Sequence, residues 1–475
     1  MSNLKWAAGP CLLLGAALLL AAGSVQAAPP TAGEAQFRSI YKEMVETDTS
    51  GATGNCTVLV EKVAARMKAA GFPAENLRVI VPPNDPKAGN LVAAYPGKDP
   101  AARAVLMLGH IDVVNARRED WTRDPFVLIE ENGEFYGRGT SDMKAQDAAW
   151  VDTLLRMQQE KIRPKRTVKM ALTCGEEGGG FTNGAGWLVE HNRDLIDAGI
   201  ALTEGGGGEL DEAGRRLAVT VMGAEKDSAS FIFELTGPGG HSSKPRPDNL
   251  ISRMSTLLTR VDQIDYPVEF NAHNRAYFMG IAPRIGGDRG AAIQTLLANP
   301  NDAAAAATVK QLPAWSAMLG TTCIPTLIEG GHAGNAQPQR VKATINCRLL
   351  QPGDYESLKA QVLRAAAEPE AKMEMTVFGG VGRPGAPPLT EAMMGPIRKA
   401  AAEVFPGVPV LPMQETFGTD ASRLIAVGIP TYGVSGMFRG FDSGNIHGLN
   451  EHISVRSVMD GRAFLYSVVR AYADQ

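Results

Sequence analysis

Short apolar runs that are typical of buried β-strands alternate with helical segments between residues 56 and 203. The runs are Leu77–Val81, Leu91–Tyr95, Ala104–Leu108, Thr167–Thr173 and Ile200–Thr203. Cys56–Ala70 and Asp142–Gln159 instead carry apolar residues at helical spacing. Strands that alternate with helices predict an α/β domain whose central sheet is mostly parallel.

The pattern changes after this domain and returns near the C-terminus. Ser228–Thr236 alternates like a strand with one buried face, and the alanine-rich segment Asp288–Leu319 is predicted to be helical. Gly379–Pro388, rich in glycine and proline, predicts the return crossing. The 475 residues exceed what one core holds. We predict a catalytic domain over residues 28–222 and 380–475, interrupted by an inserted α+β domain over residues 223–379.

The first 27 residues have the features of a secretory signal peptide. Lys5 gives a positive start, Cys11–Gly23 is apolar, and Val25–Ala27 is a small-residue cleavage pattern. An uncleaved anchor is the alternative, but the apolar run is short for a membrane span. We expect a soluble exported protein, periplasmic or secreted, that begins at Ala28.

Four cysteines remain after the predicted cleavage: Cys56, Cys174, Cys323 and Cys347. An oxidising compartment permits disulfides, and four cysteines allow three pairings. Their wide spacing favours buried free thiols at least as much as bridges. The formal net charge of -4 gives no case for nucleic acid as a partner. We also expect no membrane partner after signal cleavage.

Polar side chains follow the predicted strands. His110 ends one strand, Glu176 and Glu177 follow a second, and Glu204 follows a third. In open α/β sheets the chemistry collects at the carboxyl ends of the strands. Asp112 lies two residues after His110, on the same face of an extended chain. It can accept a hydrogen bond from the second ring nitrogen, as the partners of metal-binding histidines do.

Two imidazoles and several carboxylates together suit zinc, which takes nitrogen and oxygen ligands. The set is His110, Asp142, Glu176, Glu177, Glu204 and His447. One tetrahedral zinc cannot use so many ligands, so we expect two metals that share a carboxylate. Of the adjacent glutamates, one can bind metal while the other takes a proton from the metal-bound water, as a general base.

The motifs also occur in the order of a known enzyme family. They are GHIDVV, GEFYGRGTSDMKAQ, CGEEGG, TEGGG, GGHSSKP and IHGLNEHI. In this series the chain resembles the co-catalytic zinc family of carboxypeptidase S, aminoacylase, glutamate carboxypeptidase, dipeptidases and succinyl-diaminopimelate desuccinylase. The TEGGG form is most similar to the carboxypeptidase S and aminoacylase-like branch.

The resemblance implies two Zn²⁺ ions, with Co²⁺ or Mn²⁺ as alternatives because ligand type does not fix the metal. His110 and Glu204 would bind one metal, His447 and Glu177 the other, and Asp142 would bridge them. In the same resemblance Glu176 is the general base and Asp112 orients His110.

The resemblance also implies that the inserted domain is a lid or dimerisation domain. His241 would polarise the scissile carbonyl, often from the partner subunit. Asn335 and Arg348 match positions that hold the substrate carbonyl or carboxylate, and Gly418 lies in a substrate-binding segment. The chain departs from the family at Asn346, where aspartate is usual, and at Ala145, where glycine is common.

We therefore expect an exported zinc-dependent hydrolase that cleaves the amide bond of short peptides bearing a free carboxylate. Metal-bound hydroxide would attack the carbonyl, with Glu176 as the base. An N-acyl-amino-acid amidohydrolase, similar to aminoacylase, is the alternative within this class. A zinc-dependent binding protein without catalysis is the remote alternative. A homodimer formed through the inserted domain and a monomer both remain open.

Overall fold

The computed structural model describes residues 33–351, 353–377, 385–440 and 443–475. The predicted signal peptide, residues 1–27, and part of the predicted return crossing therefore lie outside the described residues. None of the described helices combines the length and the apolarity needed to cross a membrane.

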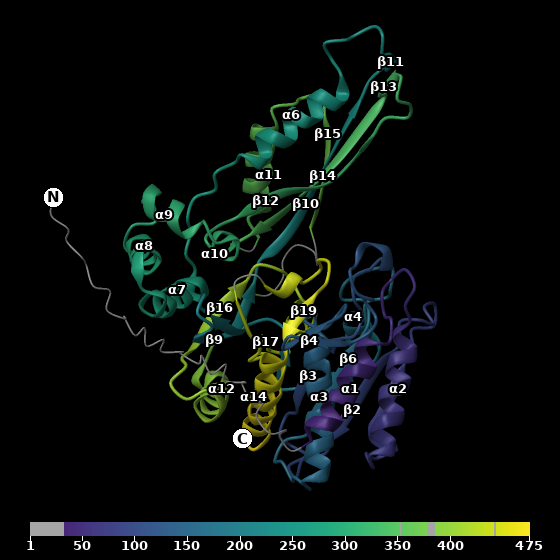
Figure 1. The fold of residues 1–475 in the computed structure, drawn as a ribbon, viewed down its shortest axis with the longest axis vertical. Helices are drawn as coiled ribbons and strands as arrows, with labels where there is room; N and C mark the ends of the chain where they lie inside the picture. Colours follow the sequence, from purple (N-terminus) through teal and green to yellow (C-terminus); the bar gives the residue numbers. More distant parts are fainter. Residues whose placement is uncertain (1–32, 352, 378–384, 441–442) are drawn as a thin grey trace, which may run out of the picture.

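A ten-stranded mixed sheet forms the centre of the catalytic part (Figure 1). Its strands are β1 Leu77–Ile80, β2 Asn90–Tyr95, β3 Val105–His110, β6 Val168–Thr173, β7 Ile200–Thr203, β8 Gly207–Leu210, β9 Arg216–Glu225, β16 Val410–Glu415, β17 Thr431–Gly433 and β18 Phe438–Arg439. The order is β1-β2-β6-β3-β7-β17-β9-β8-β18, and β16 pairs with β9. β6, β3, β7 and β17 run parallel, whereas β1 and β2 are antiparallel at one edge. The predicted α/β class is confirmed, with antiparallel pairs added outside the parallel centre.

Helices cover both faces of this sheet, and the central strands are accordingly buried on both sides. The helices are α1 Glu34–Val45, α2 Cys56–Ala69, α3 Lys144–Gln159, α4 Gly184–His191, α12 Glu391–Val404, α13 Ala421–Ala426 and α14 Val455–Ala473. Val105 and Met107 of β3 join the core made with α1, α2, α3, α12 and α14. Leu106 and Leu108 point to the opposite core, with α4 and α13. An uninterrupted apolar run is therefore what this position in the sheet requires.

A four-stranded antiparallel sheet forms the inserted part, in the order β12-β14-β10-β15. Its elements are β10 Asp227–Thr236, β12 Thr322–Gly330, β14 Arg340–Leu349, β15 Lys372–Val377 and the helices α6 Leu250–Asp262 and α11 Tyr355–Ala366. Alternate residues of β10, including Phe231 and Phe233, join α6 and α11 in one core. The short strands β11 (Gly240–His241) and β13 (Ala336–Gln337) pair at the end far from the large sheet (Figure 1).

Four further helices lie inside the predicted inserted segment but pack on the large sheet. They are α7 Ala272–Ile285, α8 Gly287–Ala298, α9 Ala303–Val309 and α10 Pro313–Met318. Tyr277, Phe278 and Trp315 share a core with Leu217 of β9 and Met413 of β16. The alanine-rich segment is thus helical, but it is divided into three helices, and α7 precedes them.

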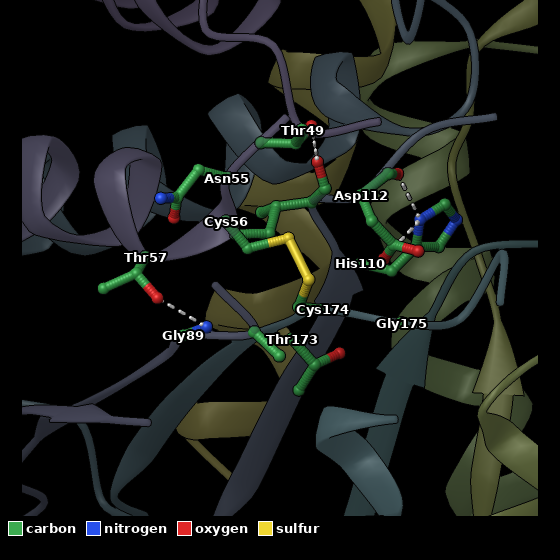
Figure 2. Close-up of a disulfide and its surroundings, with 12 residues drawn as sticks. Thr49, Asn55, Cys56, Thr57, Gly89, His110, Asp112, Thr173, Cys174 and Gly175 are labelled. Carbon is green, nitrogen blue, oxygen red and sulfur yellow. Dashed lines mark hydrogen bonds and ion pairs between the residues drawn. A yellow bond between two sulfur atoms is a disulfide. The ribbon is translucent and has the colours of Figure 1, made fainter. Parts of the chain in front are cut away.

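All four cysteines of the described chain form disulfides, Cys56–Cys174 and Cys323–Cys347. Cys56 begins α2, and Cys174 follows the last residue of β6. The structure therefore contains bridges in place of free thiols. The first bridge lies beside the end of β3, close to His110 and Asp112 (Figure 2).

Candidate metal centre

The carboxyl ends of three parallel strands bring four of the predicted ligands to one place. His110 ends β3 and is paired in register with Thr173, the last residue of β6. The loop after β6 carries Glu176 and Glu177, and Glu204 directly follows β7. Parallel strands end at the same edge of a sheet, which is why segments far apart in sequence meet here.

Asp142 lies between two imidazoles. Its Oδ1 is 3.1 Å from His110 Nε2, and its Oδ2 is 3.3 Å from His447 Nε2. His110 Nε2 is also 3.5 Å from Glu204 Oε1. His447 Nε2 is 2.8 Å from Glu177 Oε1. The structure thus brings the five predicted metal ligands into one chain of contacts, with a carboxylate at its middle.

The donor atoms have the spacing of metal ligands. His110, Glu176 and Glu204 offer atoms that all lie within 4.8 Å of one another, and so do His110, Asp142 and Glu177. In a tetrahedral site with bonds of about 2.0–2.2 Å, ligand atoms lie about 3.3–3.6 Å apart. The contacts of 2.8–3.5 Å around Asp142 are close to that range. The residues present therefore fit divalent metals.

The charges around these atoms also favour a cation. Burial raises the pKa of Glu176 to about 10, and the carboxylates of Glu204 and Asp420 add to the effect while His110 opposes it. Burial likewise raises the pKa of Glu204 to about 7. Burial would raise the pKa of Asp142, but hydrogen bonds from His110 and His447 hold it well below its usual range. A bound cation would relieve the repulsion among these buried carboxylates.

Both imidazoles respond to the same carboxylates. Hydrogen bonds to Asp142 and Glu177 raise the pKa of His447 to about 10. Burial lowers the pKa of His110, but Glu204 and Asp142 outweigh it and raise the pKa well above its usual value. Binding of a metal at these nitrogens would therefore displace protons from the imidazoles.

Asp112 holds the loop after β6 that carries Glu176 and Glu177, a contact that differs from the prediction. His110 Nδ1 lies 3.1 Å from the backbone carbonyl oxygen of Asp112, while the carboxylate Oδ1 is 3.8 Å away. The carboxylate instead accepts the backbone N–H groups of Glu176 and Glu177, at 3.3 and 3.0 Å. Asp112 therefore orients His110 through its main chain and the two glutamates through its side chain.

Glu451 fixes the turn that carries Asp142, and the sequence analysis missed it. Its carboxylate accepts the backbone N–H groups of Gly139, Ser141 and Asp142 at 3.0, 2.7 and 3.1 Å. Arg138 donates to the same carboxylate at 2.7 Å, and the two side chains are 3% and 1% exposed. The acidic residue in the motif IHGLNEHI was the only sequence signal for this role.

Asp420 is a second residue that the motifs did not single out, and its charge acts on the predicted base. Its Oδ1 accepts a hydrogen bond from Asn183 Nδ2 at 2.8 Å, and burial raises its pKa. Its negative charge also contributes to the raised pKa of Glu176. The sequence signal for Asp420 is the motif FGTDA, residues 417–421, which also contains Gly418.

Arg348 faces the same region from β14. Its pKa is lowered by burial, against the attraction of the charges on Glu176 and Glu225. Arg348 Nε donates to Asn346 Oδ1 at 3.1 Å, so the residue that departs from the family pattern still orients the guanidinium. Gly418 adjoins Thr419, whose backbone N–H and hydroxyl both donate to Glu225.

His241 and Asn335 are not brought to this cluster within the chain. His241 lies in β11, at the distal end of the inserted part, and its side chain is exposed (Figure 1). Its Nδ1 accepts a hydrogen bond from the backbone N–H of Ser243 at 3.1 Å. The backbone carbonyl of Asn335 accepts from Ser242 N, which ties Asn335 to the same end.

An α/β catalytic part with this cluster at its strand ends defines a metallohydrolase-like class. Residues 106–471 match the family described as Peptidase family M20/M25/M40, and the chain belongs to this family. It is accordingly a hydrolase that acts on amide carbon–nitrogen bonds.

The chain is similar to characterised relatives over most of its length. It is 24% identical over 388 residues to the human N-fatty-acyl-amino acid synthase/hydrolase PM20D1, covering 79% of this chain and 75% of that protein. It is 25% identical over 351 residues to aminoacylase-1 of Mus musculus, covering 73% and 75%. The structure of an M20 family metallo-carboxypeptidase from Sulfolobus solfataricus, Sso-CP2, superposes with a TM-score of 0.68 at 17% identity, covering 93% and 100%.

Proposed function

We propose that the protein is a dinuclear metal amidohydrolase that cleaves short peptides bearing a free carboxylate. The observation that carries the proposal is the position of Asp142, whose two oxygens face different imidazoles. His110 with Glu204 would hold one metal and His447 with Glu177 the other, with Asp142 shared. Zinc suits these nitrogen and oxygen donors, and cobalt or manganese are the alternatives.

Glu176 is the group proposed to move the proton. Metals bound here would supply Lewis acidity and lower the pKa of a bound water to about 7. Glu176 offers an oxygen beside His110 and Glu204, but the two ligand sets proposed above are complete without it. Its carboxylate is therefore free to take a proton from the attacking water and to pass it to the leaving nitrogen. Asp112 fixes the backbone that carries this carboxylate.

Arg348 is the group proposed to receive the substrate carboxylate. Its Nε donates to Asn346 Oδ1, and its positive charge interacts with the charge of Glu176. A planar guanidinium binds a carboxylate through two parallel hydrogen bonds. Gly418 has no atom within ordinary contact of an added Cβ other than Glu225 Oε2 at 4.0 Å, which leaves room for substrate beside the loop.

Hydrolysis of N-acyl amino acids is the second candidate function. It is supported by the similarity to PM20D1 and aminoacylase-1, whose names describe that chemistry. Both substrate classes present an amide carbonyl next to a free carboxylate. A comparison of dipeptides, tripeptides and N-acyl amino acids on the zinc-loaded protein would decide between them. If the fully metal-loaded protein turned over none of these substrates, the result would contradict both functions and favour a binding protein.

We also propose that the chain is exported and forms a homodimer through the inserted part. Two disulfides are typical of proteins in oxidising compartments and support export. The distal position of His241 supports a dimer, because only another subunit would bring this imidazole to a cluster. N-terminal sequencing of exported protein should give Ala28, and the mass in solution should be twice that of the chain.

A further inference from the structure

The loop between α1 and α2, residues 46–55, supports three segments of the candidate site. Thr49 Oγ1 donates to the backbone carbonyl of Ile111 at 2.6 Å, next to His110 (Figure 2). Ser50 forms a parallel bridge with Val113. Lys144, two residues after Asp142, donates from its Nζ to the carbonyl of Thr47 at 3.0 Å. We call residues 46–55 the supporting loop.

The glutamate loop, residues 174–180, is the third segment on the supporting loop. A Cβ added to Gly51 would lie 2.0 Å from the carbonyl oxygen of Gly179, so the two backbones are in direct contact. Gly175, Gly178, Gly179 and Gly180 all have positive φ. Glycine loses the most conformational freedom when it is ordered, so this loop needs strong attachments to hold Glu176 and Glu177 in place.

Two attachments reach the glutamate loop from the end of β3 and from the supporting loop, and Cys174 N and Gly175 O also form hydrogen bonds with the side chains of Asn90 and Asn183. The Asp112 carboxylate accepts the backbone N–H groups of Glu176 and Glu177. The other is covalent: Cys174 opens the loop and is bonded to Cys56, the first residue of α2, which directly follows the supporting loop. Both cysteines are fully buried, and Glu176 is two residues from the bridge.

We propose that the Cys56–Cys174 disulfide is a positioning device for Glu176 and Glu177, so that turnover requires this cysteine pair to be oxidised. The inference rests on the proposed function of the two glutamates. When the bridge forms, the two thiols lose two protons and two electrons to another disulfide, which is reduced to its two thiols. The reduced chain would keep the large sheet, since β3 and β6 are paired along their length, but would release the start of the glutamate loop.

The test compares two double variants of the full chain. Cys56→Ala/Cys174→Ala removes the bridge beside the site, and Cys323→Ala/Cys347→Ala removes the bridge of the inserted part as a matched control. Both variants are assayed with zinc bound and with the substrate of the panel that the wild type cleaves fastest. The kcat of the first variant should fall by about 10- to 100-fold, the effect of a misplacement of about 1 Å. Its KM should change little, and the control should keep the wild-type kcat.

Hydrogen exchange separates this inference from the proposed function. Amides of residues 174–180 should exchange faster in the first variant than in wild type or control, with and without zinc, even if no substrate is found. Unchanged exchange and unchanged kcat would overturn the positioning role.

A second variant addresses the case in which Cys56→Ala/Cys174→Ala fails to fold. Cys56→Val/Cys174→Ala refills the core with apolar atoms, and it should fold and show the same loss of kcat. If neither variant folds while the control does, the bridge holds the whole catalytic part and the proposal is wrong. Wild type reduced by tris(2-carboxyethyl)phosphine in the presence of zinc, with the thiols counted by mass spectrometry, should lose turnover in step with reduction of this pair.

Discussion

Glu176 combines a buried carboxylate with a backbone that Asp112 holds in place. We predict that Glu176→Gln lowers kcat by about 10²–10⁴-fold, because the amide keeps the shape of the side chain but cannot take a proton. Metal content and melting temperature should stay at the wild-type values. Glu190→Gln, at an exposed position of α4, is the control. Retained turnover in the Glu176 variant would contradict the role of general base.

Glu451 and Arg138 form a buried ion pair that also binds the Asp142 turn. We predict that Glu451→Gln destabilises the protein by about 3–5 kcal/mol, because it leaves the guanidinium buried without its counter-charge. Zinc affinity should fall about 10- to 100-fold, as for other residues that orient metal ligands. Denaturant unfolding of the metal-free protein and competition with a chelator measure the two effects.

The exposed pair Arg38–Glu130 provides the matched control for Glu451. Glu130→Gln should cost about 0–1 kcal/mol, since surface ion pairs are screened by water. Equal losses of stability in the two variants would mean that burial of the Glu451 pair does not matter. Unchanged zinc affinity would mean that Glu451 does not position Asp142.

The metal ligands were predictable from the sequence because each stands at a strand end or in a compact motif. His110 and Glu204 could be placed from the apolar runs before them. Glu451 could not be placed, because its partner Arg138 is 313 residues away and the short strands beside them, β5 (Glu134–Tyr136) and β19 (His452–Ser454), carry no apolar run. The contacts of Asp112 were predictable only in part. The alternation of side chains along a strand shows which face Asp112 lies on, but not that the loop with Glu176 and Glu177 passes over that face.

The crossing from β9 to β10 contains Lys226, a buried cation without a carboxylate partner among its hydrogen bonds. It donates to the carbonyls of Ala317 and Gly320 at the end of α10, and burial lowers its pKa to about 7. Between that value and about 10.4 the unfolded chain binds more protons, so this group makes stability rise with pH above about 7. Below about pH 7 both states are protonated, and the cost of burying the charge is fully present.

We predict that Lys226→Met removes this component of the pH dependence, up to about 1.4 kcal/mol per pH unit. Urea unfolding at several pH values between 7 and 10 measures the slope. Lys68→Met, at an exposed position of α2, should leave the slope unchanged. If the Lys226 variant keeps the wild-type slope of stability against pH, the buried ammonium does not cause this part of the pH dependence.

Long elements were predictable because their periodicity is set by the core they join. α2, β3, β6 and β10 all agree with the sequence pattern within a few residues. β8 begins inside the glycine run that follows Glu204, where no apolar alternation marks a strand. α8 to α10 look like one helical stretch in sequence, but Asp302 begins a separate helix, α9, by accepting the backbone N–H of Ala305. The disulfides were not predictable, because spacing does not reveal which strand ends meet.

At the scale of the whole molecule, the cluster joins segments from residue 110 to residue 447. Binding of metal to the folded state alone stabilises it, by about 2.7 kcal/mol when free metal is 100 times its dissociation constant. We predict that a chelator lowers the melting temperature and that zinc restores it. His110→Ala/His447→Ala should show no response to either. A wild-type melting temperature that is independent of chelator would contradict the metal centre.

His241 lies far from the cluster of its own chain, so a role in turnover requires a second subunit. Mixing two inactive variants tests this. If each site takes His241 from a second subunit, the Glu176→Gln and His241→Ala variants should each be inactive alone. In their heterodimer one site has a normal Glu176 and a normal His241, and the other has neither. Random mixing after dissociation should therefore restore about a quarter of wild-type turnover. Activity that stays absent after mixing, in a preparation whose mass shows dimers, would mean that His241 acts within its own chain or not at all.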